Sequence, residues 1–196
     1  MTDHTLGPRD RLIAIAMDLI DRDHPEDLSL REVARRAGLT SGAPAHHFGN
    51  KMGLLVACAE VAWKDLSLAM ERTETDATPA EAIHHKARAY IGFALSKPGP
   101  YRLLMSRRFV DKSEFAVLSA WRTRAVQGVV EQVERALGPS DDHKFPYRRG
   151  VAMWSLLHGF VTLNLNEAIS ADMREALIDE ICDCAVEVAL SQPKTR

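Results

Sequence analysis

The sequence predicts an all-α protein with an N-terminal head of three helices and a larger helical domain behind it. Apolar residues recur at spacings of three and four along most of the 196 residues, which is the period of a helix. No segment of strand length alternates between apolar and polar residues. The segment 29–51, SLREVARRAGLTSGAPAHHFGNK, carries the signals of two short helices joined by a glycine-containing turn. We therefore expect a helix-turn-helix in the head.

The first predicted helix opens at Pro8, a residue favoured in the first turn of a helix. It ends before the segment 24–27, His-Pro-Glu-Asp, which breaks the helical pattern. Its apolar residues lie on one face and should form the core of the head: Leu12, Ile13, Ala16, Leu19 and Ile20.

The second and third predicted helices make up the helix-turn-helix. Ser29 and Glu32 have the spacing of a capping box, in which each side chain bonds a backbone N–H of the first turn. Gly38 tolerates positive φ and should end the helix. Leu39 can fill the angle between the helices, and Thr40 can cap the next one.

The third helix is short of large apolar residues, because residues 41–47 are small or polar and only Phe48 is bulky. A helix inside a core would carry Leu or Ile at such positions. A plain helical hairpin is the alternative interpretation. Small and polar residues instead allow close approach to another surface, and the second helix of a helix-turn-helix enters the DNA major groove.

Asn50 should cap a long helix that runs to about Arg72. We expect this helix to be the only element shared by both domains, with residues 1–52 as the DNA-binding domain and residues 53–196 as a ligand-binding and dimerisation domain. Further helices are predicted from Pro79 to Leu95, where Lys97-Pro98-Gly99-Pro100 stops the pattern, and around Tyr101 to Met105. The last three are predicted at 113–137, 144–169 and 171–191.

The first sixty residues resemble the DNA-binding domain of the tetracycline-repressor (TetR) family. The resemblance implies a three-helix head in which Lys51 grips a DNA phosphate, in agreement with the attraction of a helix N-terminus for anions. One departure is Ala45, because the family usually has a tyrosine there that touches the DNA backbone. The matching residues are Arg11 to Ile13, Leu19-Ile20, Leu28 to Ala34, Ala37 to Thr40, His47-Phe48, Lys51 and Leu54-Leu55.

The resemblance and the helix-turn-helix pattern together predict a set of residues that face double-stranded DNA. Positive charge from Arg31, Arg35, Arg36 and Lys51 should be concentrated there, since the whole chain has a net charge of −2. The predicted DNA-binding residues are Ser29, Arg31, Thr40, Ser41, Gly42, Ala43, His46, His47 and Lys51.

A second resemblance lies in the C-terminal part. Trp154, His158 and Gly159 resemble the signature of the TetR subgroup named for Trp-His-Gly, and residues 98–109 and the Ala43-Pro44 pair fit the same subgroup. The resemblance implies a regulator of transcription, most commonly a repressor that a small molecule releases from its operator. Such a protein needs no cofactor.

The two final helices, within residues 144–191, each carry apolar residues over more than one face. Two such hairpins can form a four-helix bundle between two chains, or they can complete the core of one chain. A homodimer with two-fold symmetry would match a palindromic operator whose half-sites lie roughly 34–36 Å apart.

Aromatic residues gather in the helices behind the head, and they suggest a pocket for a small, mostly apolar effector. His158 follows Trp154 by one turn and shares its face. Aromatic residues at helical spacing also occur in ordinary cores, so both interpretations stay open. The predicted ligand-binding residues are Tyr90, Phe93, Tyr101, Met105, Trp121, Trp154 and His158, with Phe109 and Phe115 as further members of the aromatic group.

Other classes of function find little support. The sequence has no glycine-rich phosphate loop, no His-Glu-x-x-His and no nucleophile elbow, so we expect no catalytic residues and no enzyme. His84 and His85 diverge on a helix and suit no metal site. An all-α small-molecule sensor, carrier or enzyme without DNA binding is the alternative.

The compartment follows from the same sequence. Residues 1–11 have no apolar core of a secretion signal, and no apolar run is long enough to span a bilayer. Cys58, Cys182 and Cys184 are best interpreted as small buried apolar residues in a reducing compartment, with a redox switch as the alternative. A cytoplasmic location is expected.

Overall fold

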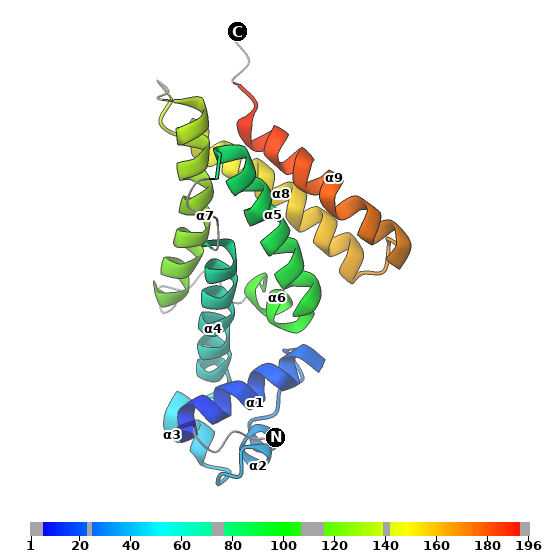
Figure 1. Ribbon diagram of the computed structural model, residues 1–196. Coiled ribbons are helices and arrows are strands. Elements are labelled where there is room, and N and C mark those ends of the chain that lie inside the picture. The colour runs from blue at the N-terminus through cyan, green and yellow to red at the C-terminus, as the bar shows by residue number, and fades with distance from the viewer. Residues whose placement is uncertain (1–5, 23–24, 72–76, 107–115, 139–141, 193–196) are drawn as a thin grey trace. The chain divides into compact units, whose positions relative to one another are not determined.

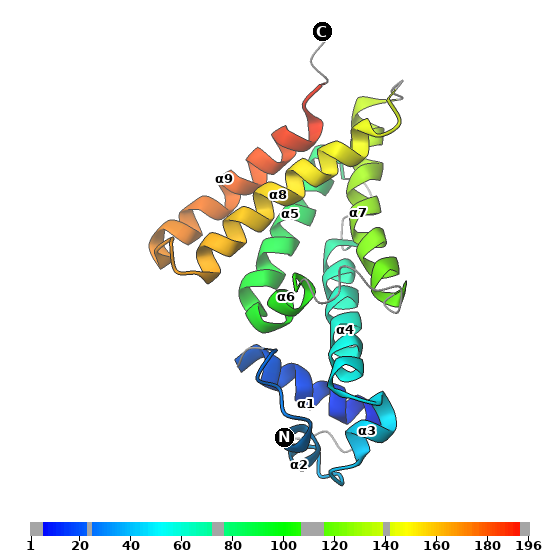
Figure 2. The same cartoon turned by 180° about the vertical axis from the view of Figure 1, so that it is seen from behind.

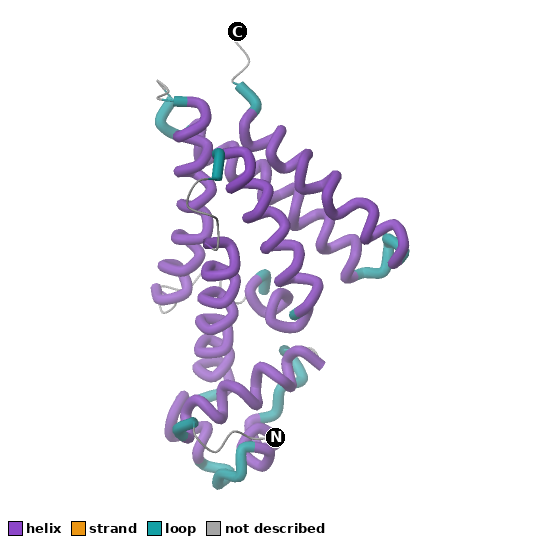
Figure 3. The backbone as a smooth tube through the Cα atoms, in the orientation of Figure 1, coloured by secondary structure: helices purple, strands orange, loops and turns teal. Residues whose placement is uncertain are grey.

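A computed structural model describes residues 6–22, 25–71, 77–106, 116–138 and 142–192. Every regular element in these residues is a helix, as Figure 3 shows, which confirms the predicted fold class. The helices are α1 (Pro8–Arg22), α2 (Leu30–Arg36), α3 (Ala43–Phe48), α4 (Lys51–Glu71), α5 (Pro79–Ser96), α6 (Pro98–Leu104), α7 (Ala116–Leu137), α8 (Phe145–Leu165) and α9 (Ala171–Leu190). Figures 1 and 2 show them from opposite sides.

The chain forms two compact units, one of residues 1–64 and 97–119 and one of residues 65–96 and 120–196. One boundary between the units falls inside α4, whose residues 51–64 belong to the first unit and 65–71 to the second. Another falls inside α7, whose residues 116–119 belong to the first unit and 120–137 to the second. The short helix α6 belongs to the first unit, although it follows α5 of the second unit directly in the chain.

The core of the first unit forms where the sequence predicted it. The apolar face of α1 is buried, and α2 and α3 pack against this helix (Figure 1). Leu12 and Ile20 have 0% and 1% of their surface exposed, and Val33 of α2 has 0%. Burial of each such side chain contributes about 1.5–3 kcal/mol, so α1 is the element that holds the helix-turn-helix in place.

The helix α6 packs on the C-terminal end of α1 at a point of backbone contact. The Gly99 N–H donates to Asp21 Oδ1 at 3.4 Å. The prediction that Pro98 to Pro100 only ends the preceding helix was incomplete, because Pro98 is also the first residue of α6. Proline has no N–H to leave unpaired in a first turn, so it can stop one helix and start the next.

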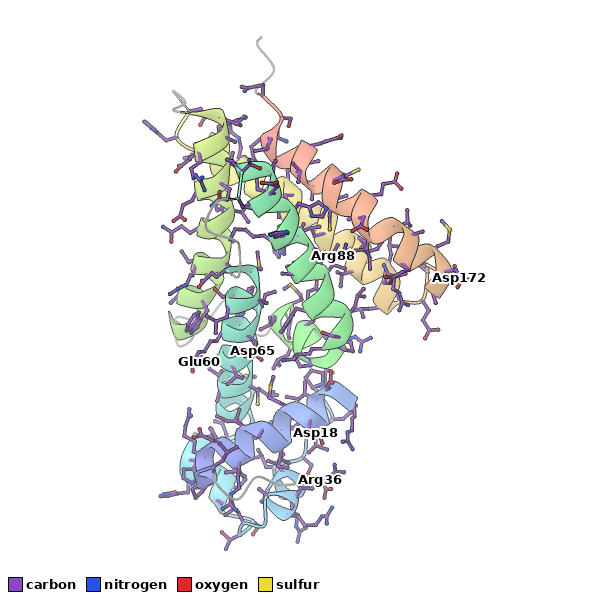
Figure 4. The ribbon with its side chains drawn as sticks, viewed as in Figure 1. Asp18, Arg36, Glu60, Asp65, Arg88 and Asp172 are labelled. Atoms are coloured by element: carbon purple, nitrogen blue, oxygen red, sulfur yellow. The ribbon has the colours of Figure 1, made fainter. Side chains whose placement is uncertain are left out.

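In the second unit, α8 and α9 lie side by side as an antiparallel pair and α5 packs against both of them (Figures 1 and 2). Arg174 Nε donates to Asn164 Oδ1 at 2.8 Å and ties the two helices near their connection. Arg88 of α5, labelled in Figure 4, pairs with Asp179 of α9. Both helices end slightly earlier than predicted. The helix α8 stops at Leu165 instead of residue 169, and α9 stops at Leu190 instead of residue 191.

A polar cluster is buried in the second unit around the last turn of α4. Lys86 is 6% exposed, and its Nζ donates to the Met70 carbonyl oxygen at 3.0 Å. Met70 has one of the carbonyls that a helix end leaves without an intrahelical partner. Arg124 of α7 binds the Glu71 carboxylate through two contacts of 2.5 and 3.0 Å. These side chains fasten the end of α4 to α5 and α7.

Candidate nucleic-acid interface

The helix-turn-helix of α2 and α3 has the predicted turn. Gly38 has φ of 67°, in the left-handed region that glycine adopts without strain, and it follows α2 directly after Ala37. Leu39 N–H then donates to the Ala34 carbonyl oxygen at 3.0 Å. The turn therefore satisfies a carbonyl at the end of α2 while it redirects the chain.

The predicted capping box is wrong. Ser29 is the N-cap residue of α2, but its side chain makes no capping hydrogen bond. Glu32 instead accepts from Arg35 Nε at 2.8 Å, from Arg35 Nη2 at 2.7 Å and from Arg36 Nε at 2.7 Å. Hydrogen bonds between charged groups are stronger than those to a neutral N–H, so the carboxylate binds the guanidinium groups instead of the backbone. They lower the pKa of Glu32 to about 2, Arg35 first and then Arg36.

The helix α3 begins later than predicted. Its N-cap residue is Gly42, whereas Thr40 lies in the turn and its carbonyl accepts from the Ala43 N–H at 3.0 Å. Thr40 is therefore not the cap. Pro44 is buried against the head, and Ser41 and His46 are exposed. A small, polar surface of this kind lets a helix approach the bases in a major groove.

The N-terminus of α4 follows α3 through a tight connection. Asn50 Oδ1 accepts from the Gly53 N–H at 3.1 Å, so the predicted cap is confirmed. Lys51 is partly exposed, and its Nζ donates to the Glu26 carbonyl oxygen at 2.5 Å. An ammonium group has three N–H donors. Lys51 can therefore hold the segment before α2 and still offer donors to a phosphate.

A groove of about 400 Å³ lies on the head beside α2 and the turn. It joins the hydroxyl-bearing residues Ser29 and Ser41 with the charged residues of α2 on one concave surface. Its walls contain three of the predicted DNA-binding residues. The lining residues are Ser29, Arg31, Glu32, Ala34, Arg35, Leu39 and Ser41.

All nine predicted DNA-binding residues lie in the first unit. Six of them are exposed, and Ala43, His47 and Lys51 are partly exposed. The rings of His46 and His47 meet edge to face at 5.1 Å between centroids. Sequence reasoning left out Arg9, whose guanidinium lies 5.4 Å from the centroid of the Phe48 ring. Arg9 and Phe48 lie far apart in the sequence, so no local pattern could predict this contact.

The predicted ligand-binding residues fall in both units. Tyr90, Phe93, Trp121, Trp154 and His158 belong to the second unit, and Tyr101 and Met105 belong to the first. Phe109 and Phe115 lie outside the described residues.

Within the second unit, the side chains of Tyr90, Trp154 and His158 meet between α5 and α8. Trp154 Nε1 donates to the Tyr90 hydroxyl at 3.0 Å, and its ring lies 6.0 Å from that of His158. Tyr90 is buried, whereas 42% of Trp154 is exposed. Trp154 therefore combines a polar contact to the interior with an apolar face on the surface.

Two buried thiols, those of Cys58 and Cys182, have little nucleophilic character. Burial raises the pKa of Cys58 to about 12 and that of Cys182 to about 11. A thiol reacts as its thiolate, so both groups are inert near neutral pH. Among the residues that the structure describes, no three His, Cys, Asp or Glu side chains gather closely enough to hold a metal ion.

Two family models match the chain. The model of bacterial regulatory proteins of the tetR family matches residues 12–58, which include α2, the turn and α3. The model of the tetracyclin repressor-like C-terminal domain matches residues 83–188, more than half of the chain. The chain belongs to the TetR family. The assignment to the Trp-His-Gly subgroup stays a prediction.

Individual relatives of this TetR-family protein are distant. It is 38% identical over 69 residues to the HTH-type transcriptional regulator BetI of Stenotrophomonas maltophilia (strain R551-3), a match over 35% of each chain. The match thus spans about a third of the length of that curated relative.

Solved structures agree in fold. A protein of unknown function from Rhodococcus sp. RHA1 has a TM-score of 0.76 and 25% identity, with 95% of both chains covered. The structure of AibR in complex with isovaleryl coenzyme A and operator DNA has a TM-score of 0.65 and 20% identity, with 94% of this chain and 98% of that chain covered. None of the described helices is long and apolar enough to cross a membrane.

Proposed function

We propose that this TetR-family protein is a ligand-responsive, DNA-binding regulator of transcription, and that it is a repressor released from its operator by a small, largely apolar molecule. The observation that carries the proposal is the helix-turn-helix: α3 is buried only at Pro44 and has Ala45 and His46 exposed, and Ser41 is exposed in the turn before it. A solvent-facing helix without large apolar residues on its outer side has little value for packing and suits contact with DNA. Residues 1–52 form the DNA-binding domain and residues 53–196 the ligand-binding domain.

The effector would bind in the second unit near Tyr90, Trp154 and His158. In this place the Trp154 indole N–H donates to the Tyr90 hydroxyl, so polar groups lie beside apolar rings. Pockets for small apolar ligands combine these features. The bound isovaleryl coenzyme A in AibR supports a small-molecule effector for a protein of this fold.

The protein would act as a homodimer through residues 144–191. Leu163 of α8 and Met173 of α9 are 50% and 54% exposed, although both are large apolar side chains. Covering them with a second copy removes apolar surface from water. A two-fold dimer positions two copies of α3 for the half-sites of a palindromic operator in cytoplasmic DNA.

Several elements can carry a signal toward the head. The helix α4 runs without interruption from the first unit into the second. The prediction that this helix is the only such element was wrong, because α7 also has residues in both units. In addition, α6 packs on α1 and is joined to α5 through Lys97 alone. A ligand that favours one position of α5 would therefore also act on α1.

A selection from random duplex DNA, followed by gel-shift titration of the enriched sequence, tests the proposal. We expect an enriched palindrome that the protein binds more tightly than unselected DNA. A carrier or enzyme without DNA binding would enrich no sequence, and this outcome would reject the proposal. DNA that flanks the protein's own gene is the first natural probe.

A further inference from the structure

Glu32 is the central residue of an ion-pair cluster on α2. Both of its carboxylate oxygens are used, one by Arg35 Nε and the other by Arg35 Nη2 and Arg36 Nε, at 2.7–2.8 Å. The Arg35 side chain is 70% exposed and that of Arg36 is 36% exposed, while Glu32 is 33% exposed. All three charged side chains therefore reach the surface, and Arg35 is the most exposed of them.

The cluster lies on the surface that the proposed function assigns to DNA. Glu32 and Arg35 line the same groove as Ser29 and Ser41. Figure 4 labels Arg36 on α2. The sequence predicted the positive charge of Arg35 and Arg36 in this region, but it did not predict their pairing with Glu32.

The pairing has an electrostatic consequence for a chain of net charge −2. The phosphates of DNA attract a basic protein surface whatever the DNA sequence is. Each phosphate that the protein neutralises increases the affinity and its dependence on salt. Arg35 and Arg36 are the natural partners for such phosphates, because guanidinium groups bind them in the same geometry as they bind a carboxylate. A phosphate must compete with Glu32 for the same N–H donors.

We propose that Glu32 restrains binding to DNA of arbitrary sequence by holding Arg35 and Arg36 in ion pairs. The inference rests on the proposed DNA binding of this head. The carboxylate removes one positive charge from the interface and occupies three donors that phosphates would otherwise use. Operator binding relies on additional contacts from α3, so it depends less on these two arginines. Glu32 therefore raises the ratio of the affinity for the operator to the affinity for DNA of arbitrary sequence.

The test compares the full-length protein with Glu32→Gln on random-sequence duplex DNA between 50 and 200 mM salt. Glutamine keeps the shape of the side chain and removes its charge. We expect tighter binding and a salt slope steeper by about 0.9 for each phosphate newly neutralised. For one phosphate, the affinity gain of the variant over the natural protein should grow about 3.5-fold as salt falls from 200 to 50 mM.

Two further variants separate this role from a general charge effect. Asp18→Asn frees Arg22 from a similar ion pair of 2.8 Å on α1, and Asp18 is labelled in Figure 4. It changes the net charge equally but should not tighten binding, since neither residue lines the groove. The triple variant Glu32→Gln, Arg35→Gln, Arg36→Gln should lose the gain. Circular dichroism confirms that each variant is folded.

The outcomes are distinct. A Glu32→Gln protein with unchanged or weaker non-specific binding overturns the inference and leaves Glu32 as a stabiliser of α2. An equal gain in Asp18→Asn also overturns it. If the natural protein binds no duplex DNA even at 50 mM salt, the proposed function itself fails.

Discussion

The carbonyl oxygen of Ile20 lies in the space that a side chain at Gly99 would occupy. A Cβ added at Gly99 would be 1.9 Å from that oxygen and 2.6 Å from Asp21 Cα. Both neighbours are backbone atoms, so no side-chain rotation can relieve the contact. The close approach of α6 to α1 therefore depends on glycine at this position.

Gly99→Ala should force α6 away from α1 and destabilise the protein by about 1–3 kcal/mol, the usual cost of overpacking a well-packed site. Gly92→Ala is the matched control, because Gly92 lies in the exposed middle of α5 with nothing within 4 Å of an added Cβ. It should stabilise the protein by up to about 1 kcal/mol through helix propensity. Urea denaturation of both variants measures the difference. Equal stability of the two would show that α6 does not rest on α1 in solution.

Lys51→Ala should weaken binding to all DNA sequences alike and reduce the salt slope by about 1, because a phosphate contact carries no sequence information. Substitutions of Ser41 or His46 should instead change the preference between sequences. Lys64→Ala serves as the control, since this exposed lysine lies on the same helix about 20 Å further along. Gel-shift titration at several salt concentrations is the measurement. An unchanged salt slope in Lys51→Ala would assign this lysine only to its contact with the Glu26 carbonyl.

Elements with strong local signals were predictable from sequence. The apolar face of α1, the left-handed Gly38 and the Asn50 cap each depend on residues close together in the chain. The predictions that failed concern side chains with competing partners or contacts between residues far apart in the sequence. Glu32 had two guanidinium groups within one helical turn, which outcompeted the backbone N–H expected from the capping box.

Packing between distant segments shows the same division. The contact of Gly99 with Ile20 joins residues far apart in sequence, and nothing in the Pro-Gly-Pro pattern shows which backbone would approach it. The buried Lys86 was likewise hidden, because a lysine in a helix is ordinarily interpreted as a solvent-facing residue. Its hydrogen bond to Met70 depends on how α4 meets α5.

Leu163→Glu should convert a dimer into a monomer. Leu163 is 50% exposed on α8, so the folded single chain tolerates a charge there, while a buried carboxylate in a two-chain interface would be costly. Ile181→Glu on α9 should act in the same direction. Light scattering should give twice 21.8 kDa for the natural protein and 21.8 kDa for the variant. Leu68→Glu, at a leucine 41% exposed on α4, should leave the mass unchanged. A natural protein of 21.8 kDa at micromolar concentration would reject the dimer.

Trp154→Ala and His158→Ala should impair the response to the effector while they spare operator binding. Both residues lie on α8, away from the helix-turn-helix in sequence, and their rings contact each other. Coupling between effector and DNA is typically worth about 1–3 kcal/mol, or roughly 5- to 150-fold in affinity. Titration of the effector against preformed protein–DNA complex gives this factor directly. Tyr90→Phe removes only the oxygen that accepts from Trp154 and should have a smaller effect. Normal release of both alanine variants would place the pocket elsewhere.

Lys86 should make the stability of the second unit depend on pH in the alkaline range. Burial lowers the pKa of its ammonium group below 10.5, although the Glu71 and Glu131 carboxylates oppose the shift. Between the lowered pKa of the folded state and 10.5, the unfolded chain binds more protons than the folded chain. The contribution of Lys86 to stability therefore rises with pH through this window, because deprotonation removes the cost of a buried charge.

Lys86→Met tests this effect, since methionine fills a similar space without a titrating group. The free energy of unfolding of the natural protein minus that of the variant should increase from pH 7 toward pH 10, because all other titrations cancel in the difference. Lys64→Met, at an exposed lysine, is the control for the loss of one positive charge. Urea denaturation at each pH supplies the values. A difference for Lys86→Met that stays constant or falls would mean that this ammonium group is as well solvated in the folded protein as in the unfolded chain.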